Sequence, residues 1–326
     1  MLRIGKGFLV SASVIAFGTM ALADQPLPPK NTTVFQFKDP QEASGVAAVG
    51  AEYGSFAVVG DEDHFDGRLI PGRGKFPLPR ASDDQDLPKK DEADDDVGAA
   101  LGPEGIDVGF LPDGRSFWVV VGEDNRTVST LDGQNFKLDE TFKEVCGRGA
   151  EGLSLGWKDD AWLIAVLWEG GYYEPGKCKA GTSRPAVSAI PNVVIFKYNP
   201  EDLSLTQIKS FPLKLDSLEI TDGQIFRAPD LAWRKDMTSL TVLLASSGKP
   251  GTGAGHLHTW LQVFDLDGDP DPSIPPFKLE DEWGDFEDPN WEGLDYTLDH
   301  SRMVMVNDNA GKKKKPQWAV IFKAPF

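Results

Sequence analysis

Five copies of one short phrase run through the chain, and this repetition constrains the fold more than any other feature. Each copy opens with a small or acidic residue, continues as a short alternating strand, reverses at a polar turn and ends in a strand rich in Val, Leu and Ile. The copies begin at Glu42, Pro103, Ala150, Ala228 and Trp291, and further strand pairs lie between them at 126–142, 192–211 and 260–279. About four short strands per repeat, with almost no helical signal, predict an all-β chain folded as a β-propeller.

The number of copies predicts five blades, with six or seven as alternatives. The N-terminal segment "TTVFQFK" (32–38) and the C-terminal segment "QWAVIFKAPF" (317–326) both have strand composition. We therefore expect the N-terminal strand to complete the last blade, because closing the ring removes an exposed sheet edge. A two-sheet sandwich is the alternative for many short strands, but it does not account for five copies of one phrase.

The first 23 residues have the pattern of a secretory signal peptide. Arg3 and Lys6 precede an apolar run at 8–22, and a small-x-small cleavage motif stands at 21–23. An uncleaved membrane anchor is the alternative, but this run is shorter than the roughly 20 residues that span a bilayer. We expect residues 1–23 to be removed and the remaining chain to be periplasmic or secreted.

Residues 24–326 are predicted to form a single propeller domain, expected to be a monomer, with an acidic loop inserted at 76–101. Those inserted residues are rich in Asp, Pro and Ala and have no periodicity. The whole chain has 51 acidic and 33 basic residues, a net charge of −18. Such a surface repels nucleic acid and anionic lipid, so neither is an expected partner, and no apolar run outside the leader is long enough for a membrane span.

The acidic residues of the repeated phrase are expected to meet on one face of the disc. In an antiparallel blade, the start of the innermost strand and the end of the second strand lie on the same face. The innermost strands begin with Glu104, Glu151 and Glu292, and second strands end at Asp61, Glu169 and Asp308. Carboxylates gathered around a channel mouth repel one another, so they require protons, arginines or a bound cation.

Two arrangements would neutralise this acidic cluster. In the first, calcium binds to carboxylate oxygens of Glu104, Glu151, Glu292, Asp61 and Asp308, since calcium takes six to eight oxygen ligands and the His and Cys clusters typical of zinc are missing. In the second, the carboxylates cap backbone amides and pair with arginines, for which Arg126, Arg148 and Arg227 are the candidates. The sequence leaves both arrangements open.

The chain has two cysteines, Cys146 and Cys178, which flank the third copy of the phrase on the acidic face. An oxidising compartment allows them to form a disulfide, and two buried free thiols are the alternative. A bridge would hold the long loop between them beside the channel mouth and contribute about 3 kcal/mol by restricting the unfolded chain.

Two shorter motifs have simpler explanations than the functions they suggest. "GLSLG" at 152–156 matches the nucleophile elbow, but it lies inside a predicted strand where other copies have Asp107 and Asp295 in place of Ser154. "DLDGDPD" at 265–271 is as acidic as a calcium loop, but its glycine and its missing final Glu do not fit the EF-hand order. We expect an accidental match and a hairpin turn respectively.

The "EGL" or "EGI" strand openings, with the endings "VVGDED" and "MVNDN", resemble bacterial propellers of the esterase-like phytase group and their SdiA-regulated relatives. The resemblance covers about Glu42 to Asp308. It implies that the acidic residues hold calcium, which screens phosphate oxygens and activates a water, and that Arg148 or Arg227 clamps an anion. The fourth copy lacks the Glu and Ser44 replaces the first one, so the family pattern is incomplete here.

Two functions are therefore expected as alternatives. The first is calcium-assisted hydrolysis of a phosphate or carboxylic ester, with Glu151, Glu292, Arg148 and Arg227 as catalytic candidates. The second is a non-catalytic propeller of the cell envelope that binds a small ligand, a glycan or a protein on the same face. The missing nucleophile and the unequal copies favour the second function.

Overall fold

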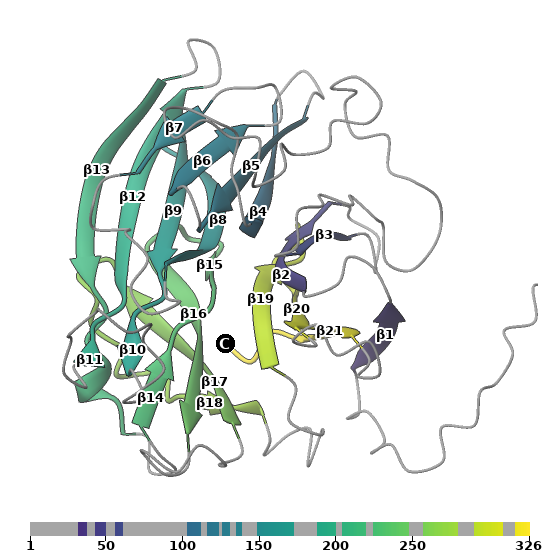
Figure 1. Ribbon diagram of the computed structural model, residues 1–326, viewed down its shortest axis with the longest axis vertical. Coiled ribbons are helices and arrows are strands. Elements are labelled where there is room, and N and C mark those ends of the chain that lie inside the picture. The colour runs from purple at the N-terminus through teal and green to yellow at the C-terminus, as the bar shows by residue number, and fades with distance from the viewer. Residues whose placement is uncertain are drawn as a thin grey trace, which may run out of the picture.

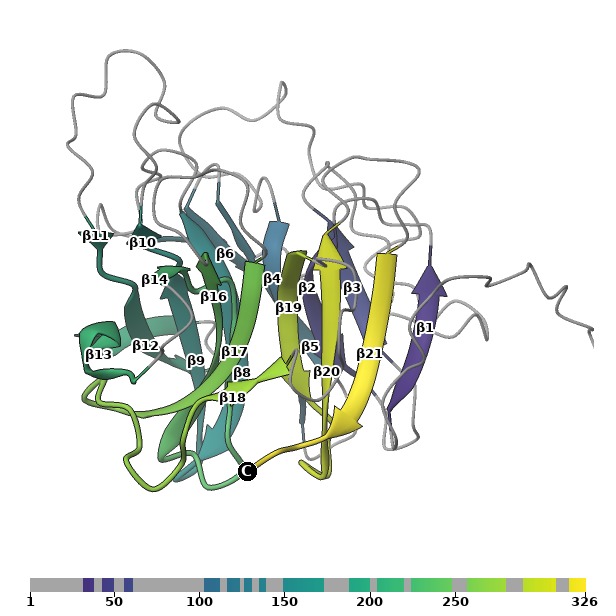
Figure 2. The same ribbon diagram turned by 90° about the horizontal axis from the view of Figure 1, so that it is seen from below.

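The computed structural model describes an all-β protein whose sheets surround a common axis, as in a β-propeller (Figure 1). The described residues are 32–37, 43–49, 56–60, 103–111, 116–123, 126–130, 135–138, 149–172, 188–199, 204–219, 224–247, 257–279, 290–308 and 317–326. Within these ranges the strands run roughly parallel to the axis (Figure 2), and helical structure is limited to the short 3-10 turn η2 (Leu215–Ser217) and to residue Leu279. The prediction of an all-β propeller is confirmed.

Three sheets have four antiparallel strands each. One contains β4 (Pro103–Phe110), β5 (Ser116–Gly122), β6 (Thr127–Thr130) and β7 (Asn135–Lys137). The next contains β8 (Ala150–Lys158), β9 (Ala161–Trp168), β12 (Asn192–Asn199) and β13 (Ser204–Pro212). The last contains β19 (Asn290–Tyr296), β20 (Arg302–Asp308), β21 (Gln317–Lys323) and β1 (Thr33–Phe37).

A fourth sheet has a split inner strand. It contains β16 (Ser239–Ser247), β17 (Leu257–Asp265) and β18 (Phe277–Lys278), while β14 (Gln224–Arg227) and β15 (Leu231–Trp233) pair with successive parts of β16. Pro229 stands in the interruption, where its missing N–H cannot donate to the ladder. Two further sheets have two strands, β2 (Ala43–Ala48) with β3 (Phe56–Gly60) and β10 (Gly171–Tyr172) with β11 (Ser188–Ala189).

The first described strand closes the ring, as the sequence predicts. β1 pairs antiparallel with β21, from Thr33 opposite Ile321 to Phe37 opposite Gln317. The last sheet is thus built from both ends of the chain, which protects the edge of β21.

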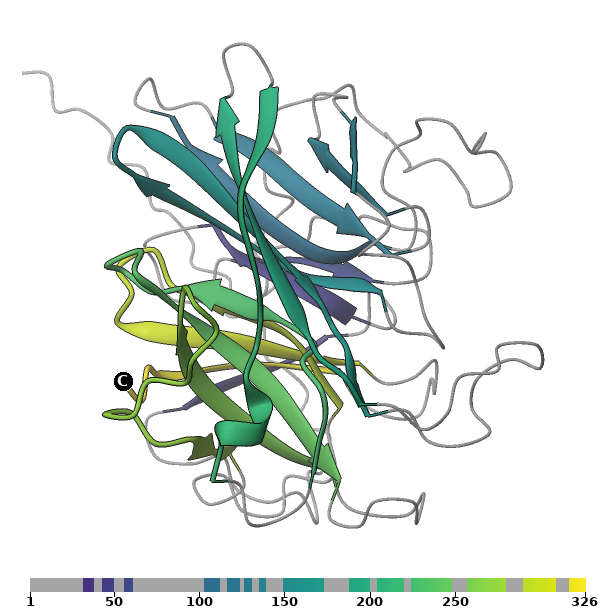
Figure 3. The ribbon, with the colours of Figure 1, turned by 90° about the vertical axis from the view of Figure 1, so that its left-hand side faces the viewer.

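The described residues form five apolar clusters, each between two neighbouring sheets. Figure 3 shows these sheets stacked face to face. Successive residues of one strand point to opposite neighbours: Val119 and Val121 of β5 pack against the sheet of β8, whereas Trp118 and Val120 pack against β2 and β3. Because both faces of each sheet are covered, the second strands read as nearly continuous apolar runs.

The inner strands approach one another most closely at the glycines of the repeated phrase. A Cβ built on Gly45 of β2 would lie 2.5 Å from the carbonyl oxygen of Glu104, and one on Gly105 of β4 would lie 2.7 Å from that of Glu151. Gly152 and Gly293 meet their neighbours in the same way. The glycine in "EGI" and "EGL" is therefore explained by contact between inner strands.

Several sequence expectations fall outside the described residues. They include the leader at 1–23, the acidic insertion at 76–101 and the pairing of Cys146 with Cys178. Among the residues that the structure does describe, no helix has the length and apolarity required to cross a membrane.

Replacing Gly105 with Ala should lower the free energy of unfolding by about 2–3 kcal/mol, because the added Cβ would overlap backbone atoms of Glu151 and Leu153 that cannot move independently. Gly156→Ala on β8 is the matched control: its Cβ would meet the flexible end of Met237, which can shift, so a loss of about 1 kcal/mol or less is expected. Urea denaturation measures both values, and equal losses would contradict the close approach of the inner strands.

Candidate functional site

The glutamates that open the inner strands are each the extra residue of a β-bulge. Pro103 pairs with Gly122 and Gly105 with Val121, so the register shifts at Glu104, which is the extra residue between these two pairs. Glu151, Glu292 and Ser44 occupy the same position in their hairpins. A bulge changes the direction of the side chain of its extra residue. Here the bulges lie near the start of β2, β4, β8 and β19. We call this end of the ring the acidic face.

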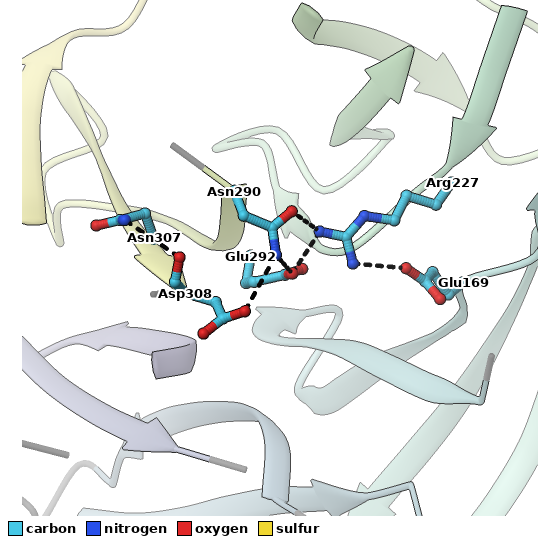
Figure 4. Close-up of polar contacts among 6 residues, drawn as sticks. All are labelled: Glu169, Arg227, Asn290, Glu292, Asn307 and Asp308. Carbon is cyan, nitrogen blue, oxygen red and sulfur yellow. Dashed lines mark hydrogen bonds and ion pairs between the residues drawn. The ribbon is translucent and has the colours of Figure 1, made fainter. Parts of the chain in front are cut away.

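Arg227 joins three sheets at the acidic face (Figure 4). It is the last residue of β14, and its Nη1 donates to Oε1 of Glu169 at 3.0 Å. Its Nη2 donates to Oε1 of Glu292 and to Oδ1 of Asn290 on β19. Both ion pairs are buried, with 12% of the Arg227 side chain exposed and 1% of that of Glu169. The arginine-pairing arrangement is therefore present at Glu169 and Glu292.

Asn290 connects the two acidic ends of its hairpin. Its Nδ2 donates to Oε1 of Glu292 at 2.5 Å and to Oδ2 of Asp308 at 3.2 Å, as Figure 4 shows. Asn290 and Asp308 also face each other in the ladder, so the start of β19 and the end of β20 lie at one rim. An amide is suited to this place because it donates to both carboxylates while its oxygen accepts from Arg227.

Glu151 lies among four other carboxylates. Burial raises its pKa well above the usual range, and the charges of Glu169, Glu104, Glu123 and Glu292 raise it further. Like charges disfavour ionisation when water cannot screen them. Glu151 therefore keeps its proton to a higher pH than a solvent-exposed glutamate does.

Glu292 titrates near neutrality because opposing effects act on it. Its pKa is raised to about 7 as the net result. Burial raises it most, Arg227 lowers it through charge and hydrogen bonding, and the charges of Glu169 and Asp308 raise it. Since the pKa is higher in the folded than in the unfolded chain, this carboxyl favours folding at low pH, and its contribution is lost as the pH rises through about 7. Burial lowers the pKa of Arg227, but the carboxylates of Glu292 and Glu169 raise it by more, so the guanidinium stays charged.

The acidic face fits a hard cation in its chemistry, since its ligands would be carboxylate and amide oxygens. Among the described side chains, however, no three His, Cys, Asp or Glu residues are arranged to hold a metal ion as they stand. Arg227 occupies the place between Glu169 and Glu292 that a shared cation would take.

The structure places part of the predicted site and leaves the rest outside the described residues. It brings Glu104, Glu151 and Glu292 into one electrostatic cluster, and Asn290 connects Asp308 to it. Asp61, Arg148, Cys146 and Cys178 lie outside the described residues. Arg227, predicted as an anion clamp, donates instead to two carboxylates and an amide of the protein.

The two shorter motifs have the structures expected for them. Ser154 of "GLSLG" is buried inside β8, where its Oγ accepts from the backbone N–H of Trp233 at 3.0 Å, so the motif forms no nucleophile elbow. The acidic stretch at 265–271 is a turn in which Oδ1 of Asp265 accepts from the N–H groups of Asp267 and Asp269 at 2.8 and 2.9 Å. Both interpretations are confirmed.

Sequence reasoning missed Asn290 and the bulges. Asn290 stands two residues before Glu292, on the same side of an ideal strand, and its polarity at the start of an inner strand was the available signal. The bulges leave no comparable signal, because an extra residue in one strand shows only when its partner strand is aligned with it.

Comparisons with known proteins give no family assignment. No protein-family model matches the chain, and no curated protein matches it. The chain is similar to the crystal structure of a thermostable family-43 glycoside hydrolase, at 10% identity over 89% of this chain and 93% of that one, with a TM-score of 0.42. It is also similar to the Dos1 propeller, at 11% identity over 85% and 70%, with a TM-score of 0.32. At these scores neither similarity carries an argument about activity.

Replacing Arg227 with Met should lower the free energy of unfolding by about 3–5 kcal/mol at pH 8, because Glu169 and Glu292 would remain buried without their cation. The loss should shrink toward pH 5, where the carboxyl of Glu292 is protonated. Lys209→Met is the control, since its exposed pair with Asp267 is screened by solvent and its removal should change stability little. Denaturation at both pH values tests this, and a pH-independent loss at Arg227 would refute the electrostatic explanation.

Proposed function

We propose that the acidic face is a cation-binding site and that calcium is the cation it takes. The observation that carries this proposal is the environment of Glu151, which faces the charges of Glu104, Glu123, Glu169 and Glu292. Arg227 binds both Glu169 and Glu292, but its single positive charge does not balance two carboxylates. A bound cation would replace the proton on Glu151 and lower the repulsion among the remaining carboxylates.

The donor set supports calcium over the transition metals. Glu104, Glu123 and Glu151 are the described residues that would hold it, and all offer carboxylate oxygens, which calcium prefers. We include Asp61 among the proposed calcium ligands because, in the sequence, it follows the second strand of the first repeat. When bound, calcium would supply a positive charge that attracts a phosphate or carboxylate group of a ligand.

The proposal also covers the number of blades, the compartment of the protein and the kind of ligand that it binds. We count β2 and β3 as a fifth blade, because β2 is an inner strand that packs between β19 and β4. Export to the periplasm or beyond would place the protein where calcium modules work at micromolar to millimolar affinity. The principal role is then calcium-dependent binding of a phosphorylated or otherwise anionic ligand.

Ester hydrolysis is a second candidate, favoured by the unequal protonation of two glutamates. The pKa of Glu151 lies well above the usual glutamate range, and the pKa of Glu292 is about 7. Two carboxyls with such different environments can divide the roles of acid and base. Glu151 would donate a proton to the leaving oxygen, and Glu292 would accept one from the attacking water.

Calorimetric titration of residues 24–326 with calcium at pH 7.5 tests the binding proposal. We expect binding accompanied by proton release from Glu151, which appears as a heat that depends on the ionisation enthalpy of the buffer. Glu151→Gln should weaken binding at least about tenfold because it removes a charged ligand. Asp267→Asn is the control, since Asp267 lies in the exposed turn at 265–271. A flat titration of the unmodified protein would overturn the proposal.

Turnover of nitrophenyl esters and nitrophenyl phosphate tests the second candidate. If Glu151 and Glu292 act as acid and base, Glu151→Gln and Glu292→Gln should each lower kcat by about 100-fold or more, while Asp267→Asn leaves it unchanged. The absence of turnover in the unmodified protein, with calcium and without it, would leave ligand binding as the function of the acidic face.

A further inference from the structure

A second polar layer lies deeper in the ring than the acidic face. Asp107 and Asp295 stand three residues after Glu104 and Glu292 on their inner strands, and Asp230 directly precedes β15. Asp107 and Asp230 are buried, with 6% and 3% of their surfaces exposed, and Asp295 is partly buried. Carboxyls are rarely placed in such a position without partners, so their contacts show what this layer does.

Each of these aspartates accepts a backbone hydrogen bond from a neighbouring inner strand. Oδ2 of Asp107 accepts from the N–H of Leu155 on β8 at 2.6 Å. Oδ2 of Asp295 accepts from the N–H of Ala48 on β2 at 2.7 Å. Inner strands of different sheets share no ladder, so these side chains supply hydrogen bonds that their backbones lack.

The remaining joints are made in the same way. Oδ2 of Asp230 accepts from the N–H of Leu294 on β19 at 2.6 Å, and Oγ of Ser154 on β8 accepts from the N–H of Trp233 on β15 at 3.0 Å. Between β2 and β4 the corresponding residue is Ala47, whose side chain has no hydrogen-bond acceptor. We call Asp107, Ser154, Asp230 and Asp295 the belt, because they connect the inner strands around the axis.

The belt aspartates also act on one another. Burial raises the pKa of Asp107 to about 7 and those of Asp230 and Asp295 well above the usual range. The charge of Asp107 raises the other two further, and Asp230 raises Asp295. Tyr296, next to Asp295, interacts with Arg234 and hydrogen-bonds Thr241. Full ionisation would place three like charges within one buried layer.

We infer that the belt is a pH-sensitive clasp, which holds the inner strands together when it retains a proton and loosens them when all three aspartates are ionised. The geometry allows this, because a protonated carboxyl keeps acceptor capacity on both oxygens and gains one donor. The backbone N–H bonds therefore persist in the protonated belt. When the last proton leaves, repulsion between carboxylates from three different sheets acts directly on the contacts between those sheets.

The sign of the effect follows from linkage. A carboxyl with a higher pKa in the folded than in the unfolded chain stabilises the fold at low pH, and this contribution is lost as the pH rises through the folded value. Folding should therefore weaken from about pH 5 to pH 9. The pKa values of Glu151 and Glu292 are also raised, so these two residues give a pH dependence of the same sign. The belt must therefore be tested in a variant in which neither residue can titrate.

The first experiment is denaturant unfolding between pH 5 and pH 9 in a Glu151→Gln, Glu292→Gln background. We expect the folding equilibrium constant to fall by at least about tenfold across this range, since one proton released per molecule gives tenfold per pH unit. Asp295→Asn in this background should flatten the pH dependence. Ser154→Ala is the control that keeps all three aspartates: the fall in stability with pH should remain, while loss of the Ser154 Oγ hydrogen bond to Oδ2 of Asp107 should raise the pKa of Asp107 further.

The second experiment needs no substitution that could prevent folding. Carbon-13 NMR of the unmodified protein, labelled at its carboxyl groups, follows the ionisation of buried aspartates directly. The Asp107 signal should titrate at about pH 7, and the signals of Asp230 and Asp295 should also titrate well above the usual aspartate value near 3.9. If every aspartate titrates below pH 5, or if Asp295→Asn leaves the pH dependence of folding unchanged, the clasp is refuted.

Discussion

The close approach of the inner strands governs both the packing and the electrostatics of this protein. At Gly45 and Gly105 the strands of neighbouring sheets lie so near that a Cβ would touch the next backbone. Side chains on the same strands are therefore concentrated around one axis, whatever their charge. The bulges place Glu104, Glu151 and Glu292 at one end of this axis, while Asp107 and Asp295 lie further along it. Every later feature of the site is a response to that crowding of carboxyl groups.

The two acidic layers reduce the repulsion between their carboxylates by different means. At the acidic face a buried arginine, Arg227, binds Glu169 and Glu292. In the belt the partners are backbone amides, which stabilise a carboxylate through hydrogen bonds but bring no net charge. Net charge must then be lowered by protons. Our proposal is that the first layer exchanges a proton for a cation from solution, whereas the belt, whose oxygens already accept hydrogen bonds between strands, is suited to hold the ring together.

The sequence predicted those features that depend on local periodicity. Alternation and turn residues located the hairpins of the repeats, and the pairing of β1 with β21 followed from strand composition at both ends of the chain. It also placed Glu292 and Asp308 at one rim, because that required only the direction of two strands. The partnership of Arg227 with Glu292 could not be read in the same way. It joins residues 65 apart in sequence through the packing of separate sheets, which no periodic pattern encodes.

The irregular copies of the phrase explain why the site is asymmetric. If the fourth copy had matched the others, a fourth strand-opening glutamate would stand where its inner strand begins. Instead this strand is interrupted at Pro229, and its upper part, β14, ends in Arg227. The same interruption brings Asp230 to a position from which it reaches Leu294. Ser44 and Ala47 in the first copy likewise replace a glutamate and an aspartate by residues without charge. The departures therefore reduce the negative charge at both levels of the ring.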